Sequence, residues 1–252
     1  MLISKGEKID NKWKLTGPIG EELFLPAATG GEKIEIGTLG TATRVKLPSK
    51  VSKYSLAVEL FNSLHRPVCV LDVRRTGMGG SGSWGPEVFT ALPQKLTGND
   101  GFQFIHLPDA APWRELLDRW RKATRENARS ENIGNTEPPH GKLPVPADLD
   151  HDDTRWRLWQ VFAASYRKDI LELAVQAVRA FIEATNFRGG LPVLLCTEPH
   201  AHDFDEADQD TQDDLCCHRF TLAKLVTRSI NADLSNAEVE RVDLDLGEQY
   251  RE

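Results

Sequence analysis

The chain has 252 residues, 40% hydrophobic and 27% charged, which is ordinary for a soluble globular protein with one core. No apolar run approaches the roughly 18 residues needed to cross a bilayer, and residues 1–8 lack the apolar stretch of a signal peptide, so we expect a cytoplasmic protein without membrane contact. The net charge of −7 belongs to residues 203–252, with 5 Lys and Arg against 14 Asp and Glu, which argues against a chain coated in nucleic-acid-binding charge but leaves room for a local basic groove.

The predicted elements begin with an N-terminal arm and a first core strand. Residues 1–32 hold short apolar pieces among Gly, Lys and Glu, which predicts an edge hairpin or a wrapped arm. Residues 33–38 form the first core strand. Its last residues, a glycine and Thr38, either allow a ligand to approach the backbone or serve a turn. Residues 52–64 carry apolar side chains at helical spacing, and Ser52 is a suitable N-cap.

A second buried strand, over residues 67–75, ends abruptly in charge. Asp72, Arg74 and Arg75 follow an apolar run. A carboxylate and two guanidinium groups at the end of a strand predict a site for a phosphate or a carboxylate. In that site Asp72 acts as a base or orients an arginine. The alternative is an internal ion pair between Asp72 and an arginine that anchors the loop.

The middle of the chain adds two candidates. Residues 101–108 form a third strand with His106 at its carboxyl end, level with the ends of the other strands if the sheet is parallel; this histidine is either catalytic or structural. Residues 130–152 have no periodicity and read as an insertion. A long helix over residues 153–185 follows, and the hydroxyl of Tyr166 in its apolar stripe is a candidate to reach the site.

The last core strand, residues 191–196, leads into the densest group of candidates. An acidic loop over residues 203–214 separates this strand from the next helix and would bind a basic protein partner or a divalent cation weakly. In open α/β sheets, ligands bind at the carboxyl ends of the strands. This segment contributes Cys196, Glu198, Cys217, His218 and Arg219 to that edge.

The sulfur and imidazole groups allow two further interpretations. A cysteine at a helix N-terminus beside positive charge favours the thiolate, so Cys216 or Cys217 is a candidate nucleophile. Zinc binding is the second interpretation, although the spacing matches no standard zinc module. The candidate zinc ligands are Cys196, His200, His202, Cys217 and His218. The alternative to both is a buried, inert Cys196 with Arg219 paired to Glu198 or Asp72.

Two motifs resemble a known family. Leu71-Asp-Val-Arg-Arg75, and Cys196-x-Glu198 followed by Cys217-His-Arg219, are similar to the hallmarks of the domain-of-unknown-function 488 family. The resemblance covers roughly residues 33–230. It implies an α/β fold and a site at these motifs, and it favours a site role for the Asp-Val-Arg motif over the ion pair, but it names no reaction. The chain departs from the family in its acidic insertion and in lacking the Pro-x-Ser that follows Asp-Val-Arg.

We therefore expect a single α/β domain over residues 33–230, with a largely parallel sheet of about four core strands flanked by helices. An N-terminal hairpin or arm precedes it, and residues 231–252 are expected to form a short helix and an acidic tail. The catalytic candidates are Asp72, His106, Glu198, Cys217 and His218. The substrate-binding candidates are Thr38, Arg74, Arg75, Tyr166 and Arg219.

Arginines mixed with carboxylates and a histidine suit an anionic substrate whose bond is cleaved with acid–base help. The first hypothesis is a hydrolase, including N-glycosidic cleavage, for a phosphate-bearing substrate such as a nucleotide or nucleic acid. In it Arg74, Arg75 and Arg219 bind the anion, and Asp72 or Glu198 activates water. The alternatives are a non-catalytic module that binds a nucleotide or nucleic acid, and a Cys/His thiol or metal site.

Overall fold

The computed structural model describes residues 2–41, 51–74, 101–111, 168–196, 218–234 and 236–246, together with Leu92 and Leu96. The strands in these ranges are β1 (Lys5–Ile9), β2 (Lys12–Thr16), β3 (Glu22–Pro26), β4 (Lys33–Gly40), β5 (Val68–Asp72), β6 (Gln103–His106), β7 (Leu191–Cys196) and β8 (Glu238–Leu244). The helices are α1 (Lys53–Ser63), α5 (Lys168–Phe187) and α7 (His218–Asp233), and a short 3-10 helix spans Pro108–Ala110. None of the described helices combines the length and the apolar character needed to cross a membrane.

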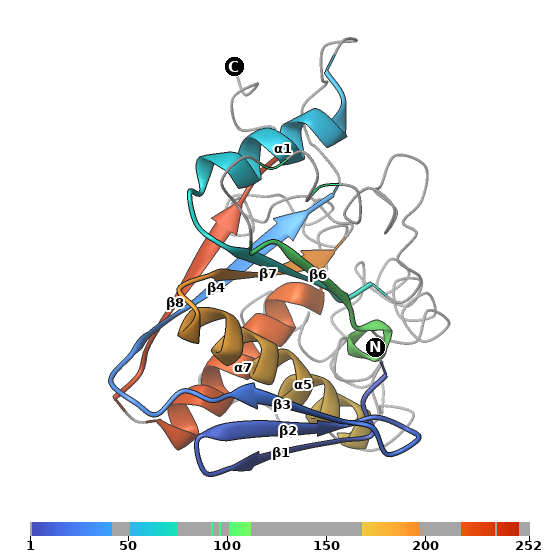
Figure 1. Cartoon of the computed structure of the whole chain (residues 1–252), viewed down its shortest axis with the longest axis vertical. Coiled ribbons are helices and arrows are strands. Elements are labelled where there is room, and N and C mark those ends of the chain that lie inside the picture. The colour runs from blue at the N-terminus through green and yellow to red at the C-terminus, as the bar shows by residue number, and fades with distance from the viewer. Residues whose placement is uncertain are drawn as a thin grey trace, which may run out of the picture.

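Strands β4 to β8 form one parallel sheet in the order β6-β5-β7-β4-β8 (Figure 1). This confirms the expected α/β fold with an N-terminal arm. The central strand is β7, and all of its residues from Leu191 to Cys196 are buried. A strand covered on both faces needs such a continuous apolar run, which is why this segment was recognisable from the sequence.

The sheet has a fifth strand, which the sequence analysis did not expect. From Glu238 to Leu244, β8 pairs in parallel with β4, inside the segment expected to be an acidic tail. Its apolar side chains are divided between the two faces of the sheet: Val239 packs on one core cluster and Val242 on the other. No single apolar face therefore marks the strand, and its charges are those that a sheet edge tolerates in contact with water.

Helices cover both faces of this sheet (Figure 1). One face packs against α1 through Leu56 and Phe61, and the other packs against α5 and α7. The crossover from β4 to β5 and the crossover from β7 to β8 run in opposite directions across the sheet, so the right-handed rule places their helices on opposite faces. The predicted N-cap of α1 is confirmed, because Ser52 Oγ accepts a hydrogen bond from Ser55 N at 3.0 Å.

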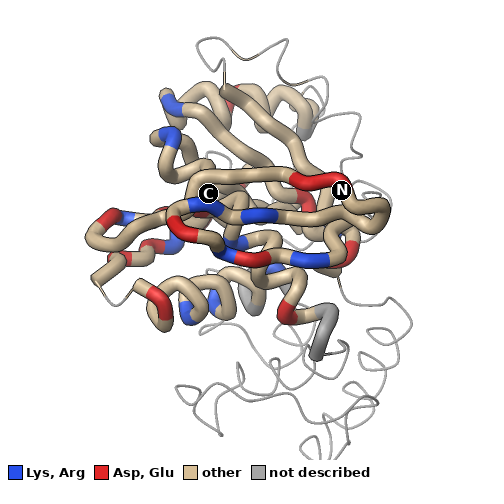
Figure 2. The backbone as a smooth tube through the Cα atoms, turned by 60° about the horizontal axis from the view of Figure 1, so that its bottom comes forward, with Lys and Arg blue, Asp and Glu red and all other residues tan. Residues whose placement is uncertain are grey.

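The N-terminal arm is a three-stranded antiparallel sheet, β1-β2-β3, that packs on α5 on the side away from the main sheet (Figure 1). Trp13 and Leu15 of β2 join the core cluster that contains the buried side of α5. Charges of both signs alternate along the exposed strands (Figure 2), and Lys14 pairs with Glu22 at 2.6 Å. The exposed face of this sheet is therefore mixed in charge rather than basic.

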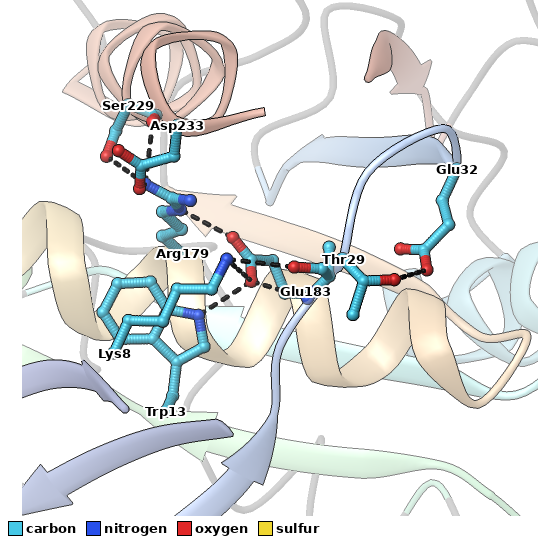
Figure 3. Close-up of polar contacts among 9 residues, drawn as sticks. Lys8, Trp13, Thr29, Glu32, Arg179, Glu183, Ser229 and Asp233 are labelled. Atoms are coloured by element: carbon cyan, nitrogen blue, oxygen red, sulfur yellow. Dashed lines mark hydrogen bonds and ion pairs between the residues drawn. The ribbon is translucent and has the colours of Figure 1, made fainter. Parts of the chain in front are cut away.

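A buried polar network joins the N-terminal sheet to α5 and α7 (Figure 3). Glu183 of α5 is 1% exposed, and its Oε2 accepts hydrogen bonds from Trp13 Nε1 at 2.8 Å and from Ala28 N at 2.9 Å. Its Oε1 accepts from Arg179 Nε at 2.6 Å, and Arg179 Nη1 lies 2.5 Å from Asp233 Oδ2 of α7. Every charge in this network has an opposite charge as a neighbour, so the three elements are fixed relative to one another.

We predict that Glu183→Ala destabilises the protein by about 3–5 kcal/mol, because it leaves the Arg179 guanidinium buried without its main counter-charge. The matched control is Glu172→Ala on the same helix, where the side chain is exposed and the expected change is within about 0.5 kcal/mol. Urea unfolding of the two variants measures the difference. Equal free energies of unfolding would show that the network contributes nothing to stability.

Candidate functional site at the carboxyl edge of the parallel sheet

The carboxyl ends of the strands bring several predicted residues to one edge of the sheet. Asp72, the last residue of β5, is the register partner of His106 in β6 and of Leu195 in β7. Cys196 in β7 is the partner of Gly40 in β4. The expected parallel alignment of Asp72, His106 and Cys196 is therefore confirmed to within one residue.

Side-chain alternation divides this edge between the two faces of the sheet. Asp72 and His106 lie on the same face as the residues two positions before them in their strands, and those residues pack with α1. Thr38 and Cys196 lie on the other face, because the residues two positions before them pack with α5 and α7. The sequence analysis expected one cluster, whereas the described candidates form two groups, one on each face. We call them the α1-side group and the α7-side group.

The α1-side group contains a bidentate ion pair between Asp72 and Arg74. Asp72 Oδ1 accepts hydrogen bonds from Arg74 N at 3.1 Å and Arg74 Nε at 2.7 Å, and Oδ2 accepts from Arg74 Nη2 at 2.8 Å. The two side chains are 0% and 5% exposed. This is the geometry of the loop-anchoring ion pair, which was the alternative to an anion clamp. In this arrangement, both oxygens of the Asp72 carboxylate are hydrogen-bonded to Arg74, and the side chain is shielded from water.

His106 completes the α1-side group. Its Nε2 lies 2.7 Å from the carbonyl oxygen of Arg74, and the neighbouring Leu107 N donates to Asp72 O at 2.8 Å. The side chain of His106 is half-buried, in contrast to the fully buried Asp72. Of these residues, His106 has the titratable side chain that water reaches.

The α7-side group includes Asp243, a residue that the sequence analysis missed. The hydroxyl of Thr38 donates to Asp243 Oδ1 at 2.7 Å, and Arg241 holds the other oxygen from Nε and Nη2, each at 3.0 Å. Thr38 is fully buried. Asp243 went unnoticed because residues 231–252 were expected to be a tail. The signal that could have found it is the short Val-x-Arg-Val-Asp-Leu run, which is compatible with a strand.

Arg219 belongs to the same face of the sheet as Thr38. It begins the buried stripe of α7, which continues through Leu222, Ala223 and Val226 at helical spacing, and it is 0% exposed. This stripe packs on the sheet, so Arg219 faces the sheet at the end of α7 nearest the carboxyl edge. A buried guanidinium in the first turn adds to the positive end of the helix dipole.

Several predicted residues lie outside the part of the chain that the structure describes, and what the sequence predicted for them stays a prediction. They are Arg75, Tyr166, Glu198, His200, His202, Cys216 and Cys217, with the side chain of His218, the segments 130–152 and 203–214, and the first part of the helix expected at 153–185. Within the described ranges, no three His, Cys, Asp or Glu side chains are grouped so that they could hold a metal ion. Of the zinc candidates, only the side chain of Cys196 falls inside these ranges, so the zinc hypothesis is not tested by that result.

The side chains of Cys69 and Cys196 are both buried. Removal from water raises the pKa of the Cys69 thiol to about 11, from an ordinary value of 9.0. A thiol with so high a pKa is a poor nucleophile near neutral pH, so Cys69 is a core residue. The thiol hypothesis therefore depends on Cys216 and Cys217, which precede α7 in the sequence.

The raised pKa of Cys69 predicts a loss of stability in alkali. In the unfolded chain this thiol loses its proton at lower pH than in the folded protein, so deprotonation stabilises the unfolded state first. From about pH 8 to about pH 10.5 the free energy of unfolding should fall by about 2 kcal/mol through this group alone. Cys69→Ala should lack this part of the decline in urea unfolding curves. Parallel declines in the two proteins would contradict the assignment.

Comparison of the chain with protein-family models, with curated proteins and with solved structures gave no match.

Proposed function

We propose that the carboxyl edge of the parallel sheet binds a phosphate-bearing substrate, such as a nucleotide or a nucleic acid, and hydrolyses it, N-glycosidic cleavage included. The observation that carries the proposal is the alignment of the strand ends. It places Asp72 beside His106, and the end of β7 leads towards α7 with Arg219 in its first turn. This is the edge at which open α/β sheets bind ligands.

Described guanidinium groups lie on both faces of the sheet near this edge. On the α1 side, Asp72 and Arg74 neutralise each other, and on the α7 side Asp243 is paired with Arg241. Arg219 adds positive charge to the first turn of α7, on the face where the sheet presents Thr38. A guanidinium in low dielectric acts on an anion more strongly than one in water. The exposed N-terminal sheet, by contrast, carries mixed charge (Figure 2).

The proposed roles follow from burial. Arg219 and the sequence candidate Arg75 supply the positive charge for the phosphate group, and Arg74 is positioned by Asp72. Glu198 or His106 activates the water, because both oxygens of the buried Asp72 carboxylate are hydrogen-bonded to Arg74. Cys217, His218 and Tyr166 remain proposed members of the site from the sequence. We also propose that residues 33–230 are related to the domain-of-unknown-function 488 family, on the strength of the two motifs.

A second proposal is a module that binds the same class of ligand without chemistry. The pairing of Asp72 with Arg74 favours it, since one of the two predicted water-activating carboxylates is occupied. A thiol or metal site at the start of α7 is the third. A location in the cytoplasm and a basic protein partner for the acidic loop 203–214 are proposals from the sequence alone.

We expect a thermal-shift screen to identify the ligand class. The purified full chain is heated with inorganic phosphate, nucleotides, sugar phosphates, short DNA and RNA, and divalent metals. A ligand at about a hundred times its dissociation constant adds roughly 2.7 kcal/mol of stability, which raises the melting temperature by on the order of 5–10 °C. Phosphate-bearing ligands should produce this shift, and metals alone should not.

Matched variants locate the binding site in the same screen. Arg75→Gln should reduce the shift, because Arg75 follows the Asp-Val-Arg motif at the carboxyl edge. Arg188→Gln should leave the shift intact, because Arg188 is exposed in the turn that leads into β7, at the opposite edge of the sheet. A shift by metals only would replace the anion site with the Cys/His site. No shift by any phosphate-bearing ligand would overturn the proposed function.

Once a ligand class is known, turnover distinguishes the enzyme from the binding module. We predict that Glu198→Gln reduces the rate at least about a hundredfold if Glu198 activates water, the typical size of a general-base contribution. Ligand-induced thermal shifts should persist in this variant. Unchanged turnover removes the role from Glu198, and absence of turnover in the wild type with an intact shift favours the binding module.

A further inference from the structure

Arg74 occupies both oxygens of the Asp72 carboxylate. Both of its oxygens accept hydrogen bonds from Arg74, three in all at 2.7–3.1 Å, and its side chain is 0% exposed. One of these bonds comes from the backbone N–H two residues further on, which closes a tight turn around Val73. The carboxylate therefore fixes the backbone of Arg74 as well as its side chain.

The fixed backbone has a partner on the next strand. The carbonyl oxygen of Arg74 lies 2.7 Å from His106 Nε2. A carbonyl oxygen only accepts hydrogen bonds, so Nε2 must carry the hydrogen. The strands hold the two groups together from both sides, because Asp72 and His106 are register partners and Leu107 N donates to Asp72 O at 2.8 Å.

We infer that Asp72 and Arg74 are positioning residues for His106, holding its ring as the Nε2–H tautomer, in which Nδ1 carries the lone pair. Carboxylates and carbonyls that fix a histidine tautomer in this way are a recurring feature of working histidines. The inference changes the roles expected for Asp72 as a base and for Arg74 as an anion clamp. Both instead act on the site through His106.

The use of Nδ1 as a general base rests on the proposed function, whereas the tautomer does not. In a hydrolysis, Nδ1 takes one proton from the attacking water while the water oxygen bonds to the substrate. The bond to the leaving group breaks, and the proton on Nδ1 passes to that group, which restores the neutral ring. The Nε2 hydrogen stays on the carbonyl of Arg74 throughout.

Nitrogen NMR of the full chain, labelled with ¹⁵N in its histidines, tests the tautomer without any substrate. The chain has 7 histidines, and His106→Gln identifies the signals of His106 by their loss. For the neutral ring we expect one tautomer, with hydrogen on Nε2 and a slowly exchanging Nε2–H resonance. Hydrogen on Nδ1, or rapid averaging of the two tautomers, would overturn the inference.

A paired substitution tests the positioning role. Asp72→Asn with Arg74→Gln replaces the ion pair with two neutral amides, so that no buried charge is left alone. Its matched control is Glu35→Gln with Arg66→Gln, which removes the half-buried ion pair between β4 and the turn before β5. The Nε2–H of His106 should exchange about tenfold faster or more in the Asp72/Arg74 variant, and at the wild-type rate in the control.

Equal exchange in the two paired variants contradicts the positioning role. If the Asp72/Arg74 variant fails to fold, the wild-type tautomer remains the deciding measurement. The variant His106→Gln provides a further test, which depends on the proposed function. The glutamine amide N–H can replace Nε2–H as the donor to the Arg74 carbonyl, but the amide cannot act as a base. This variant should keep its melting temperature and lose turnover. If no phosphate-bearing ligand shifts the melting temperature but NMR shows the expected tautomer, the proposed function is rejected and the positioning of His106 is retained.

Discussion

The buried carboxylate of Glu183 is the constraint on which the layered structure depends. A charge in the core must be compensated on every side, and Glu183 obtains its partners from three different parts of the chain: the indole of Trp13, the backbone at Ala28 and the guanidinium of Arg179 (Figure 3). Arg179 is in turn tied to Asp233 of α7. The N-terminal sheet, α5 and α7 therefore have one mutual arrangement in which all of these charges are paired.

That arrangement reaches the candidate site through α7. The helix is held at its C-terminal end by the contact of Asp233 with Arg179, and its buried stripe packs on the sheet as far as Arg219 in the first turn. The position of Arg219 at the carboxyl edge is thus linked to the packing of the N-terminal arm. On the other face of the sheet, the charged residues after β5 are fixed by their own ion pair, so the two groups of candidate residues are positioned by separate interactions.

Burial changes the chemical meaning of the candidate residues. In the sequence, Asp72 and Arg74 resemble a base and an anion clamp, yet the described structure joins them to each other out of contact with water. The half-buried His106 contacts the Arg74 carbonyl oxygen through Nε2. Asp243 shows the converse. It looked like one of many acidic residues near the C-terminus, and pairing of β8 with β4 places it against the hydroxyl of Thr38.

The sequence by itself determined the parallel α/β core, because buried strands such as β5 and β7 require continuous apolar runs and α1 requires a cap such as Ser52. It also placed Asp72, His106 and Cys196 at one edge, since parallel strands end on the same side. Tertiary structure alone decided that β8 exists, because its apolar residues serve two faces and its pairing energy comes from β4. It also paired Asp72 with Arg74, because the partner of a charge is set by which donor reaches it in three dimensions, and sequence spacing does not specify that distance.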